Sequence, residues 1–177
     1  MSKSKRYLLL LLAFTIMPLG AATACGQPGH DNGPTSSFNT YANDDWGCAI
    51  SYPSDWEVQV VPADRTCLMS PPNVMGRGSL RLDIIEALSA EQAAERWIIA
   101  LGTTWGGVTM SHCMRMEGLW DWYLSYDYDS GYGEFHGEAF FKEGTDYLYK
   151  IDTAGEKAKY DTYGFHEIVP TFELLPE

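Results

Sequence analysis

The sequence predicts an α+β fold in which an antiparallel β-sheet is flanked by helices. Short segments of alternating apolar and polar residues recur between Pro- and Gly-rich turns, as expected of strands that bury one face. One segment after Ser89 instead has the periodicity of an amphipathic helix. Over residues 108–153 the strand registers are mutually consistent, and they predict four antiparallel strands that share an apolar face. Such a face needs a cover, which helices supply in α+β proteins.

Four short strands are expected in the first half of the chain, at residues 46–52, 56–61, 66–70 and 79–86. Pro53 ends the first strand and Pro71-Pro72 ends the third, because proline cannot donate a hydrogen bond to a neighbouring strand. The fourth alternates Leu80, Leu82 and Ile84 with polar residues, which indicates a half-buried strand.

A helix is expected next, at residues 90–101. Ser89 and Gln92 have the spacing of a capping box, and Gly102 is a natural C-cap. The apolar stripe of this helix comprises Ala93, Ala94, Trp97, Ile98 and Leu101.

The strands of residues 108–153 are predicted to be joined by tight turns, with two residues at Ser130-Gly131 and three at Glu143-Gly144-Thr145. This register places His112 on the apolar face as a hydrogen-bonded core histidine, among Met110, Met114 and Met116. A second covering helix is expected around residues 156–168, with Gly164 as a weak point.

Residues 47–56 (GCAISYPSDW) resemble the opening signature of the PsbP-like family, in which Gly-aromatic-x-Ile-x-Tyr-Pro-x-x-Trp begins the domain. Ser70-Pro71 and the segment 168–172 (IVPTF) resemble later landmarks of that family, and Cys48 replaces the usual aromatic residue. The resemblance implies an α/β/α sandwich, and it is shared with exported bacterial lipoproteins of unassigned role. It implies a fold rather than an activity.

The first 24 residues predict an export signal, with a basic start, an apolar run at residues 8–17 and a small-residue end. The run is shorter than the roughly 20 residues that span a bilayer. Residues 22–25 (ATAC) resemble the lipobox of bacterial lipoproteins. This resemblance implies that Cys25 becomes a lipidated N-terminus, whose acyl chains anchor the protein on the outward side of the cell membrane. An ordinary cut at the same bond would instead give a secreted protein.

Residues 25–40 predict a flexible tether, and residues 41–177 a single globular domain. Loss of residues 1–24 removes three positive charges and takes the formal net charge from −12 to −15. Such a chain repels nucleic acid, so the expected partners are the membrane, through the anchor, and an envelope protein.

Three cysteines remain beyond Cys25. Because Cys48 and Cys67 fall in strands expected to be neighbours, they are the first choice for a disulfide in an oxidising compartment. One cysteine is then left over if Cys25 is acylated, and two bridges become possible if it is not. No CxxC or paired-His pattern predicts a zinc site.

Two polar constellations are candidate sites. The predicted registers align Ser125, His136 and Asp152 in one row, which could serve a hydrolase, but no strained nucleophile turn or oxyanion loop accompanies it, and ordinary cross-strand pairs explain it as well. Asp127, Asp129 and Glu134 meet near a hairpin tip. They could bind a divalent cation such as calcium, or form a solvated acidic tip.

The sequence therefore predicts a lipid-anchored envelope protein with a PsbP-like domain that acts by protein–protein contact, without catalysis and without a cofactor. The alternatives are an envelope hydrolase using Ser125, His136 and Asp152, and a weak divalent-cation or small-ligand binding module.

Overall fold

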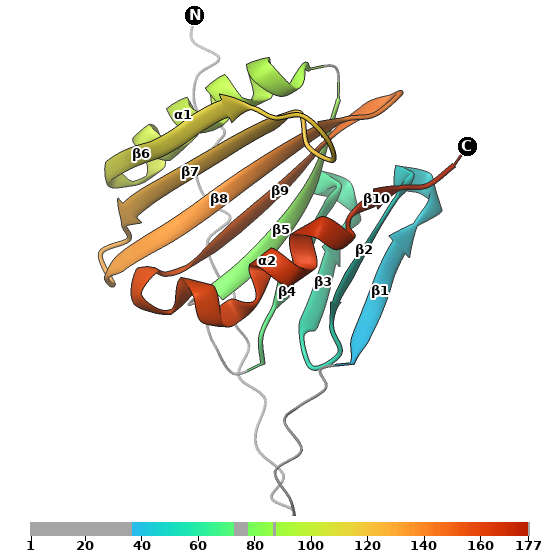
Figure 1. The fold of residues 1–177 in the computed structure, drawn as a ribbon, viewed down its shortest axis with the longest axis horizontal. Helices are drawn as coiled ribbons and strands as arrows, with labels where there is room; N and C mark the ends of the chain where they lie inside the picture. Colours follow the sequence, from blue (N-terminus) through green and yellow to red (C-terminus); the bar gives the residue numbers. More distant parts are fainter. Residues whose placement is uncertain (1–36, 73–77, 87, 177) are drawn as a thin grey trace, which may run out of the picture. The chain divides into compact units, whose positions relative to one another are not determined.

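The computed structural model describes residues 37–72, 78–86 and 88–176. The strands of these residues form two antiparallel sheets (Figure 1). The small sheet has the order β1-β2-β10, with bounds Phe38–Asn43, Cys48–Pro53 and Glu173–Leu174. Its outer strands β1 and β10 were not expected from the sequence, and β1 begins within the segment predicted as a tether.

The large sheet has seven strands in the order β3-β4-β5-β9-β8-β7-β6. In chain order these strands are β3 Glu57–Val61, β4 Thr66–Ser70, β5 Gly78–Glu86, β6 Gly106–Arg115, β7 Trp122–Asp129, β8 Glu134–Glu143 and β9 Tyr147–Glu156. The predicted α+β class is confirmed, since helices and the small sheet flank this antiparallel sheet.

Both faces of the large sheet are covered, and each has its own core. Helix α1 (Ala90–Thr104) packs on one face, against Leu124, Ala139 and Leu148. The other face packs against β2 and the C-terminal segment, which is coloured red in Figure 1. That segment contains the 3₁₀ helix η3 (Lys157–Tyr163), the short helix α2 (Phe165–Ile168) and the 3₁₀ turn η4 (Val169–Thr171).

The capping box of α1 is confirmed. The Ser89 Oγ accepts a hydrogen bond from the Gln92 N–H at 3.2 Å, and the Gln92 Oε1 accepts one from the Ser89 N–H at 3.3 Å. A carboxylate oxygen of Glu143 also caps the Ala90 N–H, at 2.6 Å. The predicted end at Gly102 is wrong, because α1 continues through this glycine to Thr104.

The C-terminal helix is interrupted where the sequence predicted weakness. Gly164 adopts a left-handed conformation with φ of 71°, which separates η3 from α2. Phe165 and Ile168 of α2 nevertheless reach the core, so this segment is a second cover, but it lies on the face opposite α1 and not on the single apolar face that the sequence predicted.

The registers of the central hairpins differ from those predicted. The β7–β8 turn lies at Gly131-Tyr132, one residue later than expected, so Tyr126 pairs with Gly137 and Asp127 with His136. This shift of two residues keeps each side chain on its predicted face. The β8–β9 turn lies at Thr145-Asp146, and the resulting shift of three residues moves β9 side chains to the opposite face.

The prediction that His112 lies in the core is also wrong. The β6–β7 register is irregular between Met110 and His112. After this irregularity, β6 side chains point to the face opposite the one that strict alternation predicts. Met110 packs with the α1 core and Met116 with the opposite core, whereas His112 and Met114 are exposed on this edge strand.

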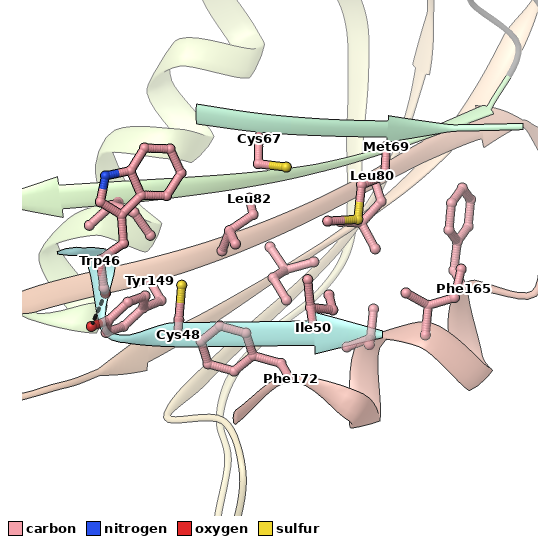
Figure 2. Packing of buried hydrophobic residues seen from close by; sticks show 14 of the residues in the cluster. Trp46, Cys48, Ile50, Cys67, Met69, Leu80, Leu82, Tyr149, Phe165 and Phe172 are labelled. Carbon is pink, nitrogen blue, oxygen red and sulfur yellow. Dashed lines mark hydrogen bonds between the residues drawn. The ribbon is translucent and has the colours of Figure 1, made fainter. Parts of the chain in front are cut away.

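The expected disulfide is absent from the structure. Cys48 lies in β2 of the small sheet and Cys67 in β4 of the large one, so their strands are not neighbours, and both thiols are free. Figure 2 shows both sulfurs among the apolar side chains of the core between the sheets. Burial raises the pKa of Cys48 to about 11 and that of Cys67 to about 12, which keeps both thiols protonated and poorly reactive.

Residues 1–24 and Cys25 lie outside the described residues. The export signal, its cleavage and the lipidation of Cys25 stay predictions from the sequence.

Candidate functional site

A pocket opens beside the C-terminal half of α1, on the face of the large sheet that this helix covers. Its volume is about 360 Å³, at the lower end of the roughly 300–1,000 Å³ typical of ligand sites. Helix α1 and the residue that follows it contribute one side, and β5, β7 and β9 contribute the floor. The principal lining side chains are Arg81, Trp97, Trp105, Tyr126, Tyr128 and Asp152.

Asp152 supplies the carboxyl group of this pocket. Its Oδ1 accepts a hydrogen bond from the Tyr126 hydroxyl at 2.6 Å. Arg81 is the residue opposite Asp152 in the β5–β9 register. Burial raises the pKa of Asp152 above its ordinary value, although the Lys150 charge and the Tyr126 hydrogen bond oppose that shift. The carboxyl group is therefore easier to protonate than a surface aspartate.

A buried ion pair lies next to this pocket. Lys150 is only 4% exposed, and its Nζ lies 2.9 Å from Asp83 Oδ2. Asp83 also accepts hydrogen bonds at 2.7 Å from the Arg81 Nε and the Thr66 hydroxyl. Burial alone would raise the pKa of Asp83, but the Lys150 and Arg81 charges outweigh burial and hold that pKa below its ordinary value.

Aromatic rings form the remaining walls. The Trp105 and Tyr128 ring centroids are 5.3 Å apart, and Trp105 is 37% exposed at the mouth. The Lys150 Nζ lies 3.3 Å from the Trp97 ring centroid, a cation–π contact that holds this indole in place. The Trp97 Nε1 is buried without a hydrogen-bond partner, although it is close enough to the Tyr126 hydroxyl to oppose the rise of that group's pKa.

A second pocket, of about 530 Å³, lies on the opposite face beside the C-terminal segment. His136 lines it, and its Nδ1 is 2.7 Å from Asp127 Oδ1. The other Asp127 oxygen accepts a hydrogen bond from the Lys157 Nζ at 2.9 Å. Burial would raise the pKa of Asp127, but the His136 and Lys157 contacts outweigh burial and lower it.

The predicted row of Ser125, His136 and Asp152 does not form. Ser125 pairs with Glu138 and His136 with Asp127, while Asp152 pairs with Ala139 on the face that α1 covers. Two register shifts are the cause: the two-residue shift between β7 and β8 separates Ser125 from His136, and the three-residue shift between β8 and β9 moves Asp152 to the opposite face. Ser125 is also only 5% exposed, so a substrate does not reach its hydroxyl.

The proposed cation ligands are not gathered either. Asp129 lies opposite Glu134 at the hairpin tip. The two carboxylate oxygens of Asp127 instead contact His136 and Lys157. Over residues 37–72, 78–86 and 88–176, no three His, Cys, Asp or Glu side chains are placed to hold one metal ion.

The α1-side pocket was missed because its polar residues belong to strands that look apolar. Arg81 and Asp83 are two residues apart in β5, and Lys150 and Asp152 are two residues apart in β9. This alternation was readable as two polar rows on one face. Only the true β5–β9 register brings the two rows together under α1.

No family model and no curated protein matches the sequence. Solved structures are similar in fold. Cyanobacterial PsbP from Synechocystis has a TM-score of 0.58 at 13% identity, with 83% of this chain and 98% of that chain covered. The Ran-binding protein Mog1p of Saccharomyces cerevisiae has a TM-score of 0.57 at 9% identity, with 80% and 97% covered.

A Pseudomonas aeruginosa protein of unknown function, described as a putative regulator, has a TM-score of 0.52 at 10% identity, with 79% and 97% covered. The chain thus has the fold that PsbP and Mog1p share, as the resemblance in residues 47–56 implied. At these identities the likeness concerns the fold alone.

None of the helices formed by the described residues is both long enough and apolar enough to cross a membrane.

Proposed function

We propose that this chain is an exported protein, anchored to the outward side of the cell membrane through a lipidated Cys25, whose PsbP/Mog1-type domain binds an envelope protein without catalysis. The observation that carries the binding role is the β7–β8 hairpin tip. Tyr132 is 98% exposed there and stands between Asp129 and Glu134.

An exposed aromatic ring between two acids is suited to a basic protein surface. Tyrosine gives large contact area at a small cost in conformational entropy and is enriched at protein interfaces. The net charge of −15 after removal of residues 1–24 adds long-range attraction to a basic partner. Mog1p, which has the same fold, is described as Ran-binding, so this fold serves protein recognition in at least that protein.

The His136 environment favours a structural role over catalysis. His136 and Lys157 both contact Asp127, which ties β7 and β8 to the start of η3. The Ser125 hydroxyl, two residues before Asp127 in β7, is buried, and the Tyr160 ring packs edge-on against His136 with the ring centroids 4.5 Å apart. A histidine–carboxylate pair without an accessible nucleophile is a common packing arrangement, and we assign no activity to it.

The anchor is tested by the mass of the N-terminal peptide of the mature protein. We expect Cys25 to be the first residue and to carry acyl chains, and the Cys25→Ala variant to leave the membrane fraction. A Cys25 that is first but unmodified would make the protein secreted, and an uncut leader would contradict export.

The contact surface is tested in the intact, anchored protein with a photo-crosslinking amino acid at position 132. A matched control carries it at Glu91, an exposed residue of α1. We expect a specific envelope protein to be linked from position 132 and not from position 91, with loss of the same complex in a Tyr132→Ala variant. Equal yields from both positions, or none from position 132, would refute the assignment of the hairpin tip.

A further inference from the structure

The pocket beside α1 has the chemistry of a carbohydrate site. We propose that it binds a neutral sugar ring, which stacks on Trp105 at the mouth and hydrogen-bonds to Asp152 and Arg81 inside. This site is separate from the hairpin tip and does not depend on the role proposed for Tyr132.

The first argument is the pairing of a donor group with an acceptor group. The Arg81 Nε is engaged by Asp83, and among the described residues its terminal nitrogens have no hydrogen-bond partner. One Asp152 oxygen accepts from Tyr126, and the described residues offer no donor to the other. Neighbouring hydroxyl groups of a sugar both donate and accept, so they can bridge a guanidinium and a carboxyl group that face each other across two strands.

The second argument is the charge balance, which disfavours ionic ligands. Arg81 and Lys150 carry two positive charges, and Asp83, which contacts both groups, balances one of them. Among the described residues that line the pocket, Asp152 has the only carboxyl group. Burial raises the pKa of Asp152, which disfavours the charged form of this carboxyl group. A cationic ligand would have to stabilise an ionised Asp152 beside two cations, and an anionic ligand would face the Asp83 and Asp152 carboxyl groups. A neutral polyhydroxyl ligand avoids both costs.

The third argument is shape and surface. Trp105 remains 37% exposed although it is large and apolar, and it stands against Tyr128. The C–H face of a pyranose ring matches such an aromatic platform, with its hydroxyl groups directed sideways to polar partners. A volume of about 360 Å³ has room for a small ligand of one or two rings.

The buried N–H of Trp97 is consistent with a functional pocket rather than a packed core. A buried donor without a hydrogen bond is unusual in native proteins and calls for an explanation. It lies near the Tyr126 hydroxyl, the group that fixes Asp152.

The test is titration of the folded domain with glucose, N-acetylglucosamine and a β-1,4-linked dimer of the latter, followed by tryptophan fluorescence and by the indole N–H signals in NMR spectra. Glucosamine and glucuronate, which carry opposite charges on the same ring, serve as comparisons. We expect a neutral sugar to bind at millimolar concentration or below and to shift the Trp105 signal, with both charged sugars weaker. A dimer that binds more tightly than its monomer would point to a polymeric glycan as the source.

Variants then locate the site. Trp105→Ala is expected to weaken binding roughly three- to tenfold and Trp105→Phe to restore most of it, because an aromatic face is kept. Asp152→Asn is expected to weaken binding about tenfold, since the amide can bond to Tyr126 but then directs a donor into the pocket. Ile99→Ala, on the exposed side of α1, is the matched control and leaves binding unchanged.

The proposal is overturned if no neutral sugar binds to the folded protein at millimolar concentration, if a charged sugar binds more tightly than its neutral counterpart, or if Ile99→Ala and Trp105→Ala weaken binding equally. Thermal melting of each variant separates loss of binding from loss of folding, and Trp105→Phe keeps the test valid if Trp105→Ala does not fold.

Discussion

Asp83 is the residue on which the buried charges of the α1 side depend. Its carboxylate contacts Lys150, Arg81 and Thr66 at 2.7–2.9 Å. Removing one partner of a buried ion pair leaves the other charge uncompensated, at a cost of about 3–5 kcal/mol. Since Arg81 can still bond to an amide oxygen, we expect Asp83→Asn to lower the free energy of unfolding at neutral pH by about 3 kcal/mol, measured by urea denaturation.

The pH dependence of stability checks the same residue. The pKa of Asp83 is lowered in the folded state, so its contribution is present above the ordinary aspartate pKa of about 3.9 and is lost as pH falls through the folded value. The difference in stability between the wild type and Asp83→Asn should therefore shrink in acid.

For Asp152 the sign is reversed, because its pKa is raised. An Asp152→Asn variant at neutral pH should therefore be no less stable than the wild type, and a large loss would contradict the assigned direction.

Gly137 is required by the ring that it faces. A Cβ at this position would lie 2.5 Å from the Tyr126 Cζ, and Tyr126 is fully buried and cannot move aside. We expect Gly137→Ala to destabilise the protein by about 1–3 kcal/mol in the same assay. The comparison is Gly102→Ala, where the added Cβ meets nothing within 4 Å in a helix. That variant should instead gain about 0.5–1 kcal/mol, and equal losses at both positions would refute the packing argument.

At the scale of elements, the start of α1 is a local construction that can be tested alone. The Ser89 Oγ and the Gln92 side chain satisfy two backbone N–H groups. Ser89→Ala is expected to reduce stability by about 1 kcal/mol, whereas Ser89→Asp, which keeps an acceptor, should stay near the wild type. Thermal melting measures both variants. If Ser89→Asp lowered the melting temperature as much as Ser89→Ala does, the lost stability would not come from the helix cap.

The capping box and the strand 66–70 were predictable because their causes are local. The central registers were not, because a turn displaced by one residue changes every cross-strand pair, and sequence alternation alone fits Ser130-Gly131 as well as Gly131-Tyr132. The segment FNTYAN of β1 has no apolar alternation, and it forms a strand only through its pairing with β2.

For the whole molecule, the decisive feature is that both faces of the large sheet are covered. The sequence predicts a sheet with one apolar and one polar face, and that prediction places Ser125, His136 and Asp152 in one row on the polar face. In the structure β9 sends Ile151 and Thr153 to the C-terminal side and Lys150 and Asp152 to the α1 side. The pocket under α1 therefore depends on pairing between strands far apart in the chain, which residue types alone could not show.

The core between the two sheets and the predicted lipidation of Cys25 together determine how many thiols react. Cys48 and Cys67 are buried and unbonded, and Cys113 is exposed. With the folded, mature protein we expect an aromatic disulfide reagent to modify Cys113 alone, and slowly, because burial and Glu95 raise its pKa. In denaturant three thiols should react, since acylation converts Cys25 to a thioether. Four would show an unmodified Cys25, and one would show that Cys48 and Cys67 pair during export, contrary to the separate strands in which they lie.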